Sequence, residues 1–140
     1  MRYVLDASAI LRYLDDEPGA AEVAQLLKRS RIGDAELLMS AANWGEVLFA
    51  ILKLHGEDAM NRAESKILSL PVQILAVDHE VAKMAAQVRF RFKMPFADSF
   101  AAAVALQNQA TVITADYDFT LLRGAVKVQM LPTKPKKKRP

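Results

Sequence analysis

Three acidic residues directly follow stretches of the chain that are expected to form strands. Asp6 comes after residues 2–5, and Asp116 and Asp118 follow residues 111–114; both stretches are rich in β-branched, aliphatic or aromatic residues. In an open parallel sheet, ligands bind beyond the carboxyl ends of the strands. Each aspartate also has an ordinary explanation, because Asp6 can cap the following helix and aspartate is common in turns.

Two further acids lie on segments that are expected to be helical. Glu46 stands within residues 42–55, at the margin of an apolar stripe that includes Trp44 and Val47. It can equally be a boundary glutamate. Asp98 stands in the first turn of residues 97–108, where an acid is favoured by the helix dipole. That segment is so apolar and rich in alanine that it should pack inside, and a carboxylate buried there needs a cation or hydrogen-bond donors.

The acids considered together predict a metal site at one edge of the sheet. Carboxylates that gather in one place repel each other, and one of them must take a proton unless a cation intervenes. Hard oxygen ligands of this kind select Mg²⁺ or Mn²⁺. An acidic cluster that holds such ions supports the attack of water on a phosphodiester. The predicted chemistry is therefore metal-dependent hydrolysis of a phosphate ester.

The elements that must position these acids alternate between strands and helices. Apolar periodicity, Asp78 as an N-cap, and breaks at Gly56, Pro71 and Pro95 define the segments. The alternation predicts an α/β domain with a central parallel sheet flanked by helices in three layers. We expect strands at residues 2–5, 37–39, 72–77 (fully buried), 111–114 and 126–131, and helices at residues 7–14, 18–30, 42–55, 57–70, 79–91 and 97–108.

Composition limits the classes of protein that remain. The 140 residues suffice for one domain with its own core, and the absence of cysteine excludes disulfides and thiolate metal sites. We expect no signal peptide and no membrane span, hence a cytoplasmic protein. Of 19 basic residues, five lie in the last seven positions, which leaves 14 against 16 acidic residues. We therefore expect a slightly acidic domain at residues 1–131 and a basic, disordered tail at residues 132–140.

Four segments of the chain resemble, in order and spacing, the motifs of the PIN domain. They are VLDASAI, NWGEVLFA, PFADSFAAAVAL and TVITADYDF, and the resemblance extends to about residue 131. The length is similar to that of bacterial and archaeal toxins of the VapBC type. In Trp44 and Gly45, which precede Glu46, the chain departs from many relatives. The basic tail is no part of the family pattern.

The resemblance implies a site, an activity and partners. It matches Asp6, Glu46, Asp98 and Asp116 to the acidic quartet that binds metal and carries catalysis in the family, and Asp118 to a frequent further acid. Ser8 and Thr114 match supporting hydroxyl positions. The implied activity is Mg²⁺- or Mn²⁺-dependent cleavage of RNA by an endoribonuclease toxin. The implied partners are an RNA substrate, an antitoxin that blocks the acidic pocket, and a second copy in a homodimer.

Residues 89–93, with the sequence RFRFK, alternate basic and aromatic side chains just before Asp98. Arg89, Arg91 and Lys93 are candidates for RNA binding, with bases stacked on Phe90 or Phe92. The alternative is that both phenylalanines belong to the core and that the cations favour the end of a helix.

Three other functions remain open from the residues. A receiver-like Mg²⁺-binding signalling module would use an aspartate after a middle strand, for which Asp78 is available, but would leave Glu46 and Asp98 unexplained. A phosphatase of the haloacid-dehalogenase type would need a second aspartate where the chain has Ser8. A non-catalytic binding protein with the PIN fold is the third alternative.

Overall fold

A sheet of five parallel strands forms the centre of the molecule. The computed structural model describes residues 1–122 and 124–133. The strands are β1 (Arg2–Leu5), β2 (Glu36–Ser40), β3 (Val72–Leu75), β4 (Thr111–Thr114) and β5 (Val128–Met130). Their order across the sheet is β3-β2-β1-β4-β5, and every pairing is parallel. The first three strands thus extend the sheet in one direction from β1, and the last two extend it in the other.

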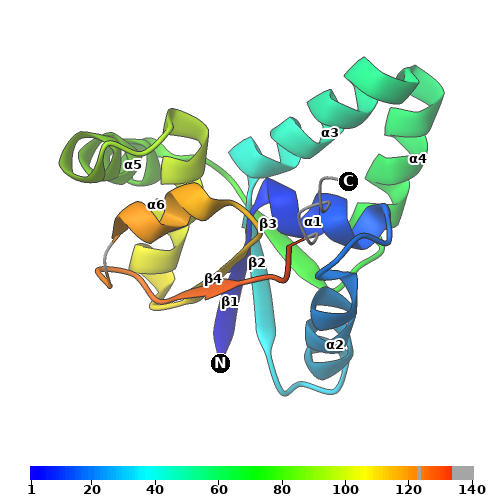
Figure 1. Cartoon of the computed structure of the whole chain (residues 1–140), viewed down its shortest axis with the longest axis horizontal. Helices are drawn as coiled ribbons and strands as arrows, with labels where there is room; N and C mark the ends of the chain where they lie inside the picture. Colours follow the sequence, from blue (N-terminus) through cyan, green and yellow to red (C-terminus); the bar gives the residue numbers. More distant parts are fainter. Residues whose placement is uncertain (123, 134–140) are drawn as a thin grey trace, which may run out of the picture.

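Helices cover both faces of this sheet (Figure 1). One face packs against α1 (Ala7–Leu14), α2 (Ala20–Arg31), α3 (Ala41–His55) and α4 (Glu57–Leu68). The other packs against α5 (His79–Phe92) and α6 (Phe96–Asn108). A short 3-10 helix, η1 (Tyr117–Leu122), follows β4. The expected three-layer α/β fold is therefore confirmed.

The pattern of β1 shows how the sequence divides its core between the two faces. Val4 belongs to the apolar cluster under α5 and α6, while Tyr3 and Leu5 belong to the cluster under α1 to α4. Successive side chains of a strand point to opposite faces, so a strand covered on both faces must be apolar at every position. Val4 and Leu5 have no exposed surface, and Tyr3 is 6% exposed.

Several expected bounds differ from the structure by a few residues, as at β5 and at the end of α4, and two differences have a clear physical reason. The strand expected to be fully buried at residues 72–77 is β3, which ends at Leu75 and is only partly buried, because it lies at the edge of the sheet and pairs with β2 alone. The helix expected from Pro18 begins at Ala20. Gly19 takes a left-handed conformation (φ +103°), and the amide of Ala20 donates to the carbonyl of Glu17, which closes a turn before the helix.

The direction of α6 explains how a helix start reaches the same edge as the strand ends. Only two residues separate α6 from β4, so the helix runs antiparallel to the strands and its first turn lies over their carboxyl ends. In the described part of the chain, no helix has the length and apolar character needed to cross a membrane. The basic tail expected at residues 132–140 lies outside the described residues from position 134 onward.

Candidate metal site

Asp6 has two structural tasks at the end of β1. It is the N-cap of α1, and its Oδ1 accepts a hydrogen bond from the Ala9 amide at 2.9 Å. The same carboxylate accepts hydrogen bonds from the hydroxyls of Ser8 (2.7 Å, on Oδ1) and Thr114 (2.5 Å, on Oδ2). Burial raises the pKa of Asp6 to about 6, although these three donors act in the opposite direction. Both sequence interpretations of Asp6, the cap and the site residue, are compatible with this geometry.

Ser8 and Thr114 join the end of β1 to the end of β4. The Thr114 hydroxyl, which is fully buried, accepts from the amide of Asp116 at 2.9 Å. The Ser8 hydroxyl accepts from the amide of Ala115, also at 2.9 Å. Each hydroxyl has one proton and donates it to Asp6. The lone pairs on the two hydroxyl oxygens are then free to accept from the backbone amides that follow β4. The two hydroxyls thereby couple the position of Asp6 to that of Asp116.

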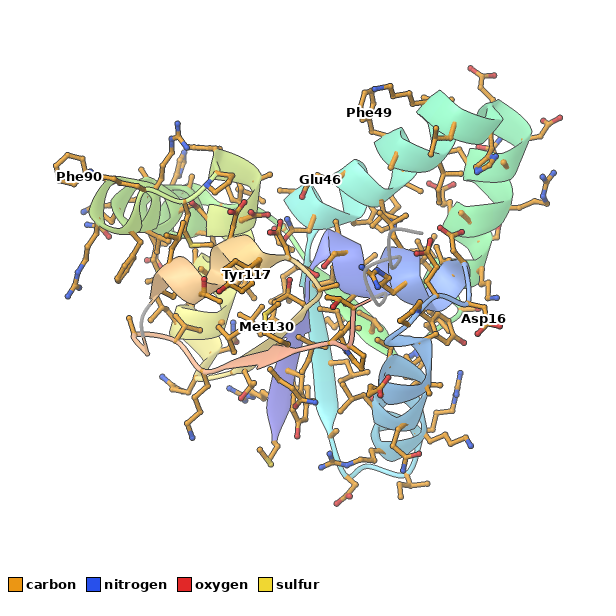
Figure 2. All side chains as sticks on the ribbon, viewed as in Figure 1. Asp16, Glu46, Phe49, Phe90, Tyr117 and Met130 are labelled. Atoms are coloured by element: carbon orange, nitrogen blue, oxygen red, sulfur yellow. The ribbon has the colours of Figure 1, made fainter. Side chains whose placement is uncertain are left out.

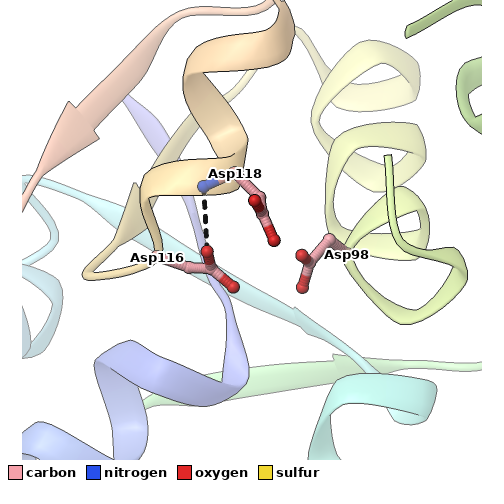
Figure 3. A group of neighbouring side chains, drawn as sticks. All are labelled: Asp98, Asp116 and Asp118. Atoms are coloured by element: carbon pink, nitrogen blue, oxygen red, sulfur yellow. Dashed lines mark hydrogen bonds between the residues drawn. The ribbon is translucent and has the colours of Figure 1, made fainter. Parts of the chain in front are cut away.

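Asp98, Asp116 and Asp118 form the tightest group of acids (Figure 3). Each offers a carboxylate oxygen such that the three atoms lie within 4.8 Å of one another. Asp98 comes from the first turn of α6, while the other two come from the end of β4 and the start of η1. The amide of Asp118 donates to Oδ1 of Asp116 at 2.9 Å, which fixes the turn between them.

The charge state of Asp98 connects the remaining acids to this group. Its pKa is raised to about 7, first by burial and then by the negative charges of its neighbours. In decreasing order of effect, these neighbours are Asp116, Asp6, Glu46 and Asp118. The other four acids expected from the sequence therefore lie near enough to Asp98 to affect it, although only Asp116 and Asp118 share the 4.8 Å group with it.

Glu46 is held in place by a residue that the sequence interpretation missed. Asn43, one turn earlier on α3, donates from its amide nitrogen to Oε1 of Glu46 at 2.7 Å and to the backbone carbonyl of Ala97 at 3.0 Å. Asn43 is 1% exposed. Its three-residue spacing from Glu46 is visible in the sequence, but its contact with α6 depends on the tertiary fold.

None of the five acids forms an ion pair with a cationic side chain within residues 1–122 and 124–133. The ion pairs in that part of the chain join Arg2 to Glu36 and Arg29 to Asp34. Clustered carboxylates without a counter-charge bind a cation or take up protons. The group of Asp98, Asp116 and Asp118 supplies only oxygen ligands, which fit a hard divalent cation.

Arg89, Arg91 and Lys93 lie at the carboxyl end of α5. Arg89 donates to the Met94 carbonyl at 2.7 Å, Arg91 stacks over the ring of Phe92, and Lys93 is the left-handed C-cap. None of the three has a hydrogen bond or ion pair with the acids in the described part of the chain. Phe92 packs against the core, as expected if the phenylalanines of this segment have a structural role.

Phe90 differs from Phe92, because its side chain is 89% exposed. Figure 2 shows it at the outer end of α5, away from Glu46 and Tyr117. Its ring is exposed and therefore available for stacking. The use of this segment in RNA binding remains a prediction.

The strand order separates this fold from a receiver-like module. Doubly wound receiver domains have the order 2-1-3-4-5, whereas this sheet has the order β3-β2-β1-β4-β5. Asp78 is exposed, follows the edge strand β3 and caps α5 by accepting from the Val81 amide. It is therefore no central phosphate acceptor.

The chain belongs to the PIN domain family, whose model matches residues 3–124. Its structural neighbours are toxins of VapBC toxin–antitoxin systems. No curated protein sequence matches the chain significantly.

Three solved structures illustrate the likeness. VapBC2 from Rickettsia felis, bound to a DNA fragment from its promoter, has 14% identity and a TM-score of 0.77 and covers 94% of this chain and 100% of its own. FitAcB from Neisseria gonorrhoeae has 26% identity and a TM-score of 0.67, with coverages of 90% and 95%. VapC20 from Mycobacterium tuberculosis, a toxin that cleaves the sarcin–ricin loop, has 19% identity and a TM-score of 0.69, with coverages of 93% and 99%.

Proposed function

We propose that this protein is an Mg²⁺- or Mn²⁺-dependent endoribonuclease and the toxin of a type II toxin–antitoxin pair. The observation that carries the proposal is the group of three carboxylates within 4.8 Å, at the edge where β1 and β4 end. The chain first adds β2 and β3 on one side of β1 and then adds β4 and β5 on the other side. Open α/β sheets bind ligands at such a switch point. Membership of the PIN family supports nuclease activity.

In this proposal Asp6, Glu46, Asp98 and Asp116 hold the divalent cation, with Asp118 as a further ligand. When bound there, the cation would lower the pKa of a water molecule and would offset negative charge at the phosphate. Ser8 and Thr114 keep the Asp6 carboxylate in a fixed orientation through their hydroxyl donors. We assign no separate general base, since any of the carboxylates at the site can accept the proton released by the attacking water.

The proposed partners follow from relatives and from family membership. VapBC2 and FitAcB were solved as toxin–antitoxin complexes. By analogy, this chain would bind an antitoxin that covers the acids, and would form a homodimer. Its domain would comprise residues 1–131.

The deciding experiment is cleavage of total RNA by purified wild type and by Asp98→Asn, with Mg²⁺, with Mn²⁺ and with chelator. Discrete fragments that require both the metal and Asp98 are expected, with a loss of about 100-fold or more in the variant, beyond what the loss of a mere supporting partner usually costs. Sequencing the fragment ends then identifies the target.

Asp78→Asn is the matched control. It makes the same change at an exposed cap, where asparagine serves as well as aspartate, and it should cleave as wild type does. If folded wild type without antitoxin gave no metal-dependent cleavage, the proposal would fail. A non-catalytic PIN-fold binding protein would then be the better description.

A further inference from the structure

Asn43 is a buried amide that joins two of the elements that carry the site. It lies in the first turn of α3, directly after the end of β2, and is 1% exposed. One of its hydrogen bonds stays within α3 and reaches Glu46. The other crosses to α6 and reaches the carbonyl of Ala97, the residue immediately before Asp98. One side chain therefore fixes Glu46 relative to the helix turn that carries Asp98.

The orientation of the Asn43 amide follows from its partners. Both partners are acceptors, a carboxylate oxygen and a backbone carbonyl, so the nitrogen must face them and use its two protons. The remaining atom, Oδ1, is buried without a hydrogen-bond partner in the described part of the chain. Leucine has the same branched outline, although it is larger, and brings no polar atom that needs a partner, so packing alone does not explain an asparagine here.

The contacts of Glu46 explain what the amide is needed for. Glu46 and Asp98 bring two carboxylates to the same edge of the sheet, and like charges repel when no cation lies between them. A free glutamate side chain on a partly exposed helix face would turn toward water. The hydrogen bond from Asn43 to Oε1 opposes that movement and leaves the second oxygen, Oε2, for an ion.

We propose that Asn43 is a positioning residue, which holds Glu46 ready for a divalent cation and ties α3 to the start of α6. The inference rests on the proposed function, because it concerns the same cation. Partners that orient metal ligands in this way typically change metal affinity by about 10- to 100-fold when they are lost. Asn43 itself need not touch the ion.

The test measures Mn²⁺ affinity by titration calorimetry, without RNA. Asn43→Leu should bind Mn²⁺ about 10- to 100-fold more weakly than wild type. Asn108→Leu is the matched control, because Asn108 also donates its amide to a backbone carbonyl, that of Val104, but at the opposite end of α6. That control should bind Mn²⁺ as wild type does. The affinities are measured at a temperature where each protein is folded, since losing the bond to Ala97 should lower the melting temperature of Asn43→Leu in chelator. A merely structural role would lower that temperature without changing the Mn²⁺ affinity.

A double-mutant cycle with Glu46→Gln tests whether Asn43 acts through Glu46. If it does, adding Asn43→Leu to Glu46→Gln changes Mn²⁺ affinity by less than about twofold, since interacting residues are not additive. If Asn43→Leu does not melt cooperatively, Asn43→Ala replaces it, because a smaller side chain cannot clash, and the same order of affinities is expected.

Two results would overturn the role of Asn43 alone: wild-type Mn²⁺ affinity in Asn43→Leu, or additive losses in the cycle. If wild type itself bound no Mn²⁺, the proposed function would fail and this inference with it. The two failures are thus distinguished by the wild-type titration.

Discussion

Asp6 illustrates how one residue serves folding and chemistry together. Its Oδ1 caps α1, and its two oxygens also accept from Ser8 and Thr114. A carboxylate that is 3% exposed must be satisfied by donors or by a cation, and here the donors come from the backbone and from both neighbouring segments. The cap explains why the aspartate is tolerated at this position. It does not explain why two hydroxyls also face it.

The raised pKa values of Asp6 and Asp98 predict how stability without metal depends on pH. Both values, about 6 and about 7, exceed the ordinary aspartate value of 3.8, so the folded state holds these protons more tightly than the unfolded state. The contribution of the two groups to the free energy of unfolding is therefore greatest below about pH 4. It decreases as pH rises through about 7, the pKa of Asp98, and levels off only about one pH unit higher. For Asp6, the rise in pKa from 3.8 to about 6 corresponds to roughly 3 kcal/mol in the free energy of unfolding.

The measurement compares melting temperatures of wild type and Asp98→Asn in chelator from pH 5 to pH 8. The asparagine that replaces Asp98 cannot ionise, so the variant should gain stability relative to wild type as the pH rises, with most of the gain below about pH 7. Mn²⁺ should raise the wild-type melting temperature most at pH 8 and the variant's much less. A difference between the two proteins that does not vary with pH would show that Asp98 ionises normally.

At the residue scale, the acids could be found in the sequence but their support could not. Asp6 and Asp116 each follow a strand, and this position alone brings them to one edge of a parallel sheet. Asn43 gave no such signal. Its partner Ala97 is 54 positions away, and only the packing of α3 against α6 brings them together.

At the element scale, periodicity predicted the type of each α-helix and strand but not its environment. An apolar run such as residues 72–77 is typical of a strand buried on both sides, yet β3 is the edge strand. Whether a strand is central depends on pairings that apolarity does not encode. The 3-10 helix η1 was also missed, because aspartates at residues 116 and 118 are equally at home in a turn.

The small side chains of α6 let it approach the sheet and α5 closely. Ala101, Ala102, Ala103 and Ala105 are at most 1% exposed. Because Asp98 sits on the same rigid helix, we expect overpacking to disturb the site as well as the core. Ala102→Leu should lower the free energy of unfolding by about 1–3 kcal/mol in urea denaturation and should weaken Mn²⁺ binding.

Ala86→Leu on α5 is the control for this prediction. Ala86 is exposed, so the same added volume meets solvent, and stability should change by less than about 0.5 kcal/mol. If Ala102→Leu were as stable as Ala86→Leu, the interior beside α6 would have to contain free space, and close packing would not be what positions Asp98.

At the scale of the whole molecule, the order of the strands creates the site. The chain builds β1, β2 and β3 outward, then returns to place β4 on the other side of β1. The ends of β1 and β4 become neighbours although Asp6 and Asp116 are 110 positions apart in the numbering. Alternation of strands and helices predicted a parallel sheet, but several strand orders satisfy that pattern. The resemblance to the PIN domain, carried by four motifs, was needed to select the family.

The distribution of charge over the whole chain raises a problem for binding RNA. Outside the last seven residues there are 14 basic and 16 acidic residues, while Lys134, Lys136, Lys137, Lys138 and Arg139 stand together in the tail. RNA is a polyanion, so an acidic site repels it. A bound cation offsets only the charge near that cation. We therefore expect the tail to contribute attraction to phosphates that is not specific for sequence.

The tail prediction is tested on Asp98→Asn, so that the RNA stays intact during the measurement. Replacing the five basic tail residues by glutamine should weaken binding of single-stranded RNA and reduce the slope of log affinity against log salt by at most about 3.5, or about 0.7 for each cation. Fluorescence anisotropy over a range of salt concentrations gives the slope. In the cleaving protein, the same tail replacement should raise KM and leave kcat unchanged, because attraction to phosphates acts before the chemical step. An unchanged slope would mean that the RNA is attracted by cations of the folded domain, with Arg91 and Lys93 at the end of α5 as the first residues to replace.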